Sequence, residues 1–148
     1  MGAYQTVAVG TDGSESSFRA VDRAATIAAD SKALLLIICA YKPAKPSGEA
    51  EQALGEDAAF HVVGSTPAEE TLRDARERAA AKGSIEIDTV AVQGDPIDRV
   101  IEVVADRGAD LVVVGNRGLN SLAGRLLGSV PQGISRRAGS DVLIVHTT

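Results

Sequence analysis

The chain has 148 residues, a formal net charge of −5 and an aromatic content of 3%. Nucleic acid is not an expected partner, because an acidic chain with few aromatic side chains lacks the basic face and the stacking surfaces that such binding needs. Its single cysteine, Cys39, cannot form an internal disulfide, and no apolar stretch approaches the roughly 18 residues of a membrane span. We expect one cytoplasmic domain over residues 1–148, without a membrane partner.

Apolar, strand-like segments alternate with helix-like segments along the chain. The strand-like segments are 4–10, 33–40, 85–92, 110–114 and 141–146. This alternation predicts an α/β fold with a parallel sheet. The runs at 34–38 and 111–114 lack polar alternation, which is typical of central strands covered by helices on both faces. Segment 85–92 alternates less cleanly, so we expect it at an edge of the sheet.

The helices between these strands carry start and stop signals of the usual kinds. The first is predicted to begin near Ser14, and the second at a Thr66-Pro67 cap. Asp95-Pro96 opens the third, which Gly108 ends. The second helix is predicted to bury one face formed by Ala68, Leu72, Ala75 and Ala79.

The connection 41–65 contains several prolines and glycines and has weak periodicity. A connection of this length can be a lid over a ligand or a disordered segment, and its composition fits both. It also contains His61. The other histidine, His146, is remote in sequence, and the two lack the spacing of a known catalytic triad motif.

The motif that carries chemistry follows the fourth predicted strand, in the stretch GNRGLNSLAGRLLGS. Gly115, Gly118 and Gly128 are separated by two and nine residues, and Ser129 follows directly. Glycines let backbone N–H groups approach a phosphate closely. Ser129 and Pro131 then open a fourth helix, whose N-terminus favours an anion. A single glycine would indicate a turn, but the whole array at the carboxyl end of a strand favours a phosphate-bearing ligand.

Together with VGTDGSESS at residues 9–17, this array resembles the universal stress protein family, and the resemblance covers nearly the whole chain. It implies a doubly wound, Rossmann-like α/β fold: a five-stranded parallel sheet in the order 3-2-1-4-5, with helices on both faces. It also implies a homodimer formed through the C-terminal strand, residues 142–146. The chain is most similar to a single-domain subgroup with cyclic AMP binding, so the ligand implied is cyclic AMP or ATP, with Mg²⁺ as a candidate companion of ATP.

The same resemblance implies the residues of the binding site. Those expected around the adenine and ribose are Gly10, Thr11, Asp12 and Ala40. Those expected around the ribose and phosphates are Val114, Gly115, Gly118, Gly128, Ser129 and Val130. Asn116 stands where many relatives carry serine or threonine. Arg117 and Arg125 are candidates to balance the phosphate charge, although each could equally be a solvent-exposed loop residue.

Three functions compete: a regulatory or ligand-buffering module that binds an adenine nucleotide, a slow ATPase or adenine-nucleotide hydrolase of similar fold, and a structural dimer without a ligand. The complete glycine array argues against the third. Neither a G-x-x-x-x-G-K-[ST] motif nor a G-x-G-x-x-G motif after the first strand is present, and no metal-binding cluster or general base accompanies the loop. We therefore expect a binding protein that is not an enzyme.

Overall fold

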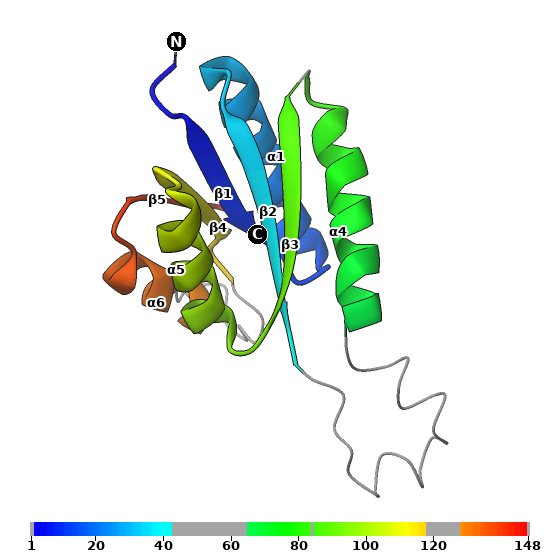
Figure 1. Cartoon of the computed structure of the whole chain (residues 1–148), viewed down its shortest axis with the longest axis vertical. Coiled ribbons are helices and arrows are strands. Elements are labelled where there is room, and N and C mark those ends of the chain that lie inside the picture. The colour runs from blue at the N-terminus through cyan, green and yellow to red at the C-terminus, as the bar shows by residue number, and fades with distance from the viewer. Residues whose placement is uncertain (1, 43–64, 84, 118–127, 148) are drawn as a thin grey trace, which may run out of the picture.

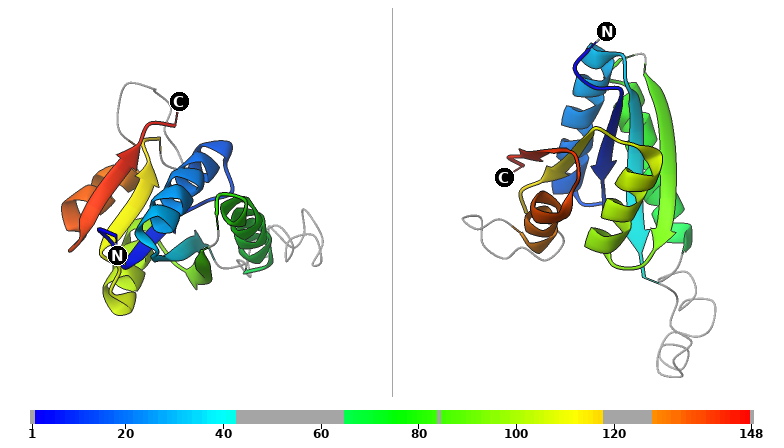
Figure 2. Two further views of the ribbon diagram at one scale, coloured as in Figure 1. Left: turned by 90° about the horizontal axis from the view of Figure 1, so that it is seen from above. Right: turned by 60° about the vertical axis from the view of Figure 1, so that its left-hand side comes forward.

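The computed structural model describes residues 2–42, 65–83, 85–117 and 128–147, which form an open parallel sheet with helices on both faces (Figures 1 and 2). Its strands are β1 (Thr6–Gly10), β2 (Leu34–Tyr41), β3 (Glu86–Gln93), β4 (Leu111–Gly115) and β5 (Asp141–Val145). All four pairings are parallel, and the order is β3-β2-β1-β4-β5. The predicted fold class and strand order are confirmed, and β3 lies at an edge as expected.

The helices cover the sheet in two pairs. They are α1 (Glu15–Ser31), α4 (Ser65–Ala80), α5 (Pro96–Arg107) and α6 (Ser129–Arg137). Helices α1 and α4 share one apolar core with Leu35 and Ile37, whereas α5 and α6 share the other with Leu36 and Ile38. Because successive side chains of a strand point to opposite faces, a strand buried on both sides has no polar alternation. This explains the continuous apolar run of β2.

Three of the four helices described begin where the sequence signals predict. Ser14 caps α1, Asp95 caps α5, and α6 begins at Ser129. The exception is α4, which already begins at Ser65, so the expected Thr66 cap is wrong. Pro67 is tolerated there, because the N–H groups of a first helical turn have no partner within the helix. The predicted inner face of α4 is confirmed as buried: Ala68, Leu72, Ala75 and Ala79.

The connection between β2 and α4 contains the candidate lid and His61, and residues 43–64 of it lie outside the described residues. Within the ranges that the structure covers, no helix is both long enough and apolar enough to span a bilayer.

Asp110 links the start of β1 to the start of β4. Its carboxylate accepts hydrogen bonds from the backbone N–H of Thr6 (2.9 Å) and of Gln5 (3.0 Å). Partial burial alone would raise the pKa of Asp110, but hydrogen bonds from the backbone N–H groups of Thr6, Gln5 and Asp110 itself outweigh it and lower the pKa below its ordinary value. The charged carboxylate therefore stabilises the folded state.

Asp110→Asn should lower the free energy of unfolding at pH 7 by about 1 kcal/mol, because hydrogen bonds to a charged acceptor are stronger than those to an amide but solvent weakens them here. A carboxylate with a lowered folded pKa stabilises above its unfolded pKa, about 3.9, and this contribution is lost as the pH falls through the folded value. Urea unfolding of both proteins at pH 7 and below pH 4 measures the difference, which should shrink in acid. A constant difference across this range would contradict the assignment.

Candidate functional site

A pocket opens at the carboxyl ends of β1, β2 and β4. Strand β1 lies between β2 and β4, so the chain leaves these neighbouring strands toward opposite faces and a crevice forms between the loops. The lining residues are Gly10, Thr11, Asp12, Ser14, Ser16, Ser17, Ile38, Ala40, Pro96, Val100, Val114, Gly115, Val130 and Pro131. Helix α5 and the start of α6 close the crevice from one side, and the β1–α1 turn closes it from the other.

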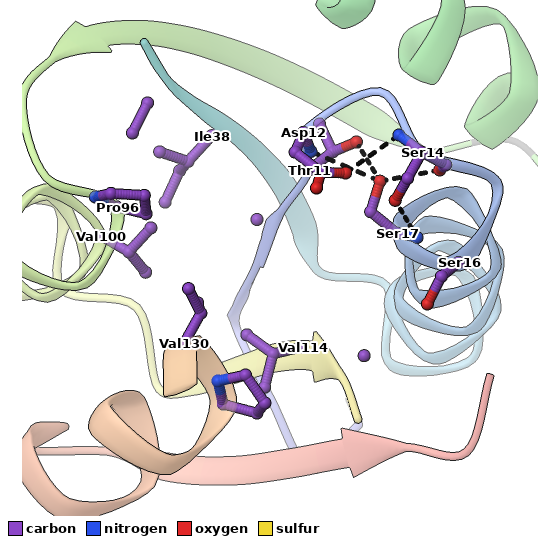
Figure 3. Close-up of a pocket in the computed structure, with 14 residues that line it drawn as sticks. Thr11, Asp12, Ser14, Ser16, Ser17, Ile38, Pro96, Val100, Val114 and Val130 are labelled. Atoms are coloured by element: carbon purple, nitrogen blue, oxygen red, sulfur yellow. Dashed lines mark hydrogen bonds between the residues drawn. The ribbon is translucent and has the colours of Figure 1, made fainter. Parts of the chain in front are cut away.

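The two sides of the pocket differ in polarity (Figure 3). On the left of the view, Ile38, Pro96 and Val100 form an apolar wall, with Val130 below them. On the right, the β1–α1 turn and the start of α1 form a polar wall of serine and threonine hydroxyls and the Asp12 carboxylate. A pocket with one apolar wall and a few convergent polar groups suits a ligand that has a flat ring at one end and polar substituents at the other.

Side chains of the polar wall organise their own turn. Asp12 Oδ1 accepts a hydrogen bond from the N–H of Ser14 (2.9 Å), and Ser14 Oγ accepts one from the N–H of Ser17 (3.1 Å). Gly13 has φ +86°, a conformation that other residues rarely adopt. Asp-Gly here is therefore part of a turn that also places the Asp12 carboxylate at the pocket.

The exit of β4 is fixed on both sides. The N–H of Asn116 donates to the carbonyl of Val145 (2.9 Å), and the N–H of Gly128 donates to the carbonyl of Asn116 (3.0 Å). The ends of the glycine-rich stretch are thus joined beside the pocket. A Cβ at Gly115 would lie 3.3 Å from Thr147 Cγ2, so a glycine there also makes room for Thr147. No sequence pattern indicated that second role.

The structure brings about half of the expected site residues together. Those that line the pocket are Gly10, Thr11, Asp12, Ala40, Val114, Gly115 and Val130. Four others are described but are not among its lining residues: Asn116, Arg117, Gly128 and Ser129. Gly118 and Arg125 lie outside the described residues. The amide oxygen of Asn116 accepts two hydrogen bonds from Thr147, one from its backbone N–H and one from its hydroxyl.

Sequence reasoning missed seven lining residues. Three of them, Ser14, Ser16 and Ser17, belong to the VGTDGSESS segment and could have been found by treating its hydroxyls as ligand groups. The other four are Ile38, Pro96, Val100 and Pro131. Pro96 and Val100 had no such signal, because their pattern is that of an ordinary capped amphipathic helix. Their place in the site depends on where α5 packs.

Cys39 is next to the pocket residue Ala40 but belongs to the other face of β2. Burial raises the pKa of its thiol to about 11, and the carboxylates of Asp12 and Glu69 act in the same direction. At neutral pH the side chain is therefore a buried, protonated thiol, the form with little nucleophilic character. This agrees with the interpretation of Cys39 as a core residue.

Comparison with known proteins identifies relatives over the whole chain. The model of the Universal stress protein family matches residues 3–146. Universal stress protein Rv1636 of Mycobacterium tuberculosis H37Rv is 52% identical over 149 residues, which is 100% of both chains. A crystal structure of a universal stress protein in complex with cAMP is 48% identical, with a TM-score of 0.77 over 99% of each chain. The universal stress protein UspA from Lactobacillus plantarum, 20% identical, shares the fold with a TM-score of 0.79 over 96% of this chain and 97% of that one.

Proposed function

We propose that this chain, which belongs to the universal stress protein family, binds an adenine nucleotide in the pocket at the ends of β1, β2 and β4. The observation that carries this proposal is the pairing of an apolar and a polar wall at the switch point of the sheet. The 48% identity to a family member in complex with cAMP supports it. The function is regulatory or ligand-buffering, and it is exerted in the cytoplasm, where a free thiol such as Cys39 stays reduced.

The adenine ring fits the apolar wall, where the backbone of Ala40 can recognise it. The N–H of Thr11 donates to the carbonyl of Ile38 (2.9 Å), which is the last rung between β1 and β2. Alternate residues of a strand direct their N–H and C=O groups to the same neighbouring strand. Those of Ala40 therefore point, like those of Ile38, toward the β1 side, where β1 has already ended and the pocket opens. They offer one donor and one acceptor, which complement the N1 acceptor and the N6 amino donor of adenine.

The phosphate fits the side of the pocket formed by Gly115 and the start of α6. Val130 and Pro131 line the pocket within the first turn of this helix, whose N-terminal N–H groups and dipole favour an anion. The Asp12 carboxylate on the facing wall disfavours a ligand with several negative charges. A cyclic phosphate, with one charge, therefore suits the pocket better than a triphosphate without a metal ion.

Cyclic AMP should bind at least as tightly as ATP in the absence of Mg²⁺, and the difference should narrow when Mg²⁺ neutralises part of the triphosphate charge. Competitive calorimetric titration of both nucleotides, with and without Mg²⁺, measures this. ATP binding tenfold more tightly without the metal, about 1.4 kcal/mol, would contradict the charge argument. Neither nucleotide should be hydrolysed above the rate in buffer, which chromatography of the incubated mixtures can check.

A further inference from the structure

Thr147, just after β5, joins the C-terminal end of the chain to the pocket. Its side chain is buried, with 3% of the residue exposed. Its backbone carbonyl accepts a hydrogen bond from Arg19 Nη1 (2.8 Å), and its hydroxyl lies 2.5 Å from the hydroxyl of Ser16. Ser16 lines the polar wall of the pocket (Figure 3). Thr147, which does not itself line the pocket, therefore contacts a residue that does.

The contacts of Thr147 fix the direction of this hydroxyl pair. The backbone N–H of Thr147 can only donate, so the Asn116 atom 3.0 Å from it is the carbonyl oxygen Oδ1. That oxygen can only accept, so the Thr147 hydroxyl, 2.9 Å away, donates its proton to Asn116. Thr147 Oγ1 is then an acceptor toward Ser16, and Ser16 must donate. Since its proton points to Thr147, Ser16 offers the pocket a lone pair and no donor.

A second pair of hydrogen-bonded hydroxyls on the same wall, Thr11 and Ser17, also directs its protons into the protein. Ser17 Oγ donates to the backbone carbonyl of Ser14 (2.9 Å), so in its contact with Thr11 Oγ1 (2.8 Å) Thr11 is the donor. Thr11 and Ser17 thus use their protons within the protein, as Ser16 does. Ser17 Oγ accepts from both Thr11 Oγ1 and the N–H of Asp12, and Thr11 Oγ1 accepts from the N–H of Gly13. The acceptors left for a ligand on this wall are therefore Ser16 Oγ, the Asp12 carboxylate and one lone pair of Thr11, which fit a hydroxyl or amino donor better than a phosphate oxygen.

We propose that Ser16 is a specificity-determining residue that accepts a hydrogen bond from a free ribose hydroxyl of the ligand. Thr147 and Asn116 are positioning residues that hold its lone pair toward the pocket. This inference rests on the proposed nucleotide binding. In cyclic AMP the 3′ and 5′ oxygens are esterified, so the donors are the 2′-hydroxyl and the adenine amino group. With the adenine at the apolar wall, the 2′-hydroxyl is the donor available to Ser16.

The test compares the affinities of cyclic AMP and 2′-deoxy cyclic AMP for the unaltered protein, three variants of the hydroxyl pair and one control variant. The unaltered protein should prefer cyclic AMP roughly fivefold to tenfold, the effect of one hydrogen bond. Ser16→Ala should abolish this preference. Thr147→Val should reduce it to less than twofold, because Ser16 is then free to rotate and donate elsewhere, whereas Thr147→Ser keeps the hydroxyl and should restore it.

Ser135→Ala is the matched control, because Ser135 lies on α6, is exposed and donates to the carbonyl of Gln132. It should leave the preference unchanged, and thermal unfolding of each variant verifies that the fold persists. A preference retained in Ser16→Ala would overturn the role of Ser16, while binding of cyclic AMP itself would still support the proposed function. Failure of the unaltered protein to bind either nucleotide would overturn both.

Discussion

Replacing Ala40 by phenylalanine is expected to lower the affinity for cyclic AMP at least a hundredfold, about 2.8 kcal/mol, without unfolding the protein. Ala40 is half-buried at the carboxyl end of β2 and lines the pocket. By the alternation of side chains along a strand, it shares a face with Ile38, on the side covered by α5. The larger ring would extend into the pocket, where the adenine is proposed to lie, rather than into the packed core.

Ala105→Phe is the matched control for this variant. Ala105 is an exposed residue of α5, so the same change in size occurs outside the pocket. Calorimetric titration gives the two affinities, and circular dichroism verifies the fold. An affinity of Ala40→Phe within threefold of that of the control would show that the adenine does not occupy this wall.

We propose that two copies of the chain pair edge to edge through β5, and Ile144→Pro is then expected to give a monomer. Strand β5 lies at the edge of the sheet, and the carbonyl of Val145 accepts a hydrogen bond from the N–H of Asn116. By alternation, the backbone groups of Ile144 face away from β4, toward the open edge. An apolar edge strand without proline pairs readily with a second copy, and proline at this position removes an outward donor while keeping the rungs to β4.

The opposite edge supplies the control for the dimer. Directly after β3, the N–H of Gly94 donates to the carbonyl of Tyr41 on β2. By alternation, the backbone groups of Thr89 point outward, as those of Ile144 do on β5. Thr89→Pro should therefore leave the dimer intact. Sedimentation velocity at micromolar concentration distinguishes the two species. A monomeric unaltered protein, or a dimeric Ile144→Pro variant, would refute assembly through β5.

Local patterns predicted the elements of the fold well, because a strand that is buried on both faces is a continuous apolar run in the sequence. The apolar runs of β2 and β4, the Asp95-Pro96 start of α5 and the left-handed Gly108 at its end are local features that the structure confirms. The strand order could be predicted only from the family resemblance, since an apolar run does not indicate which strands it pairs with. The start of α4 was missed because Thr66-Pro67 satisfies the capping pattern equally well one residue inside the helix.

The site was predictable where its residues follow strands and not where they depend on packing. Gly10 and Gly115 end strands whose carboxyl ends must meet at one edge of a parallel sheet. Val100 belongs to a helix that reaches the pocket only through tertiary packing. Thr147 is the extreme example, because its neighbours in sequence carry no motif and its partners Ser16 and Asn116 are 131 and 31 residues away. The single-domain organisation stays a prediction.

Parallel strands also give the two ends of this chain unequal surroundings. The described chain starts at the amino ends of the strands, where the N–H of Gly2 donates to the carbonyl of Ser31, and it ends at Thr147, beside Gly115. A fluorophore attached after the last residue would consequently sit within reach of the pocket mouth, whereas one attached before the first would be separated from it by the length of the sheet. The C-terminus is thus the natural attachment point for an optical sensor of occupancy, and the N-terminus the natural place for an affinity handle.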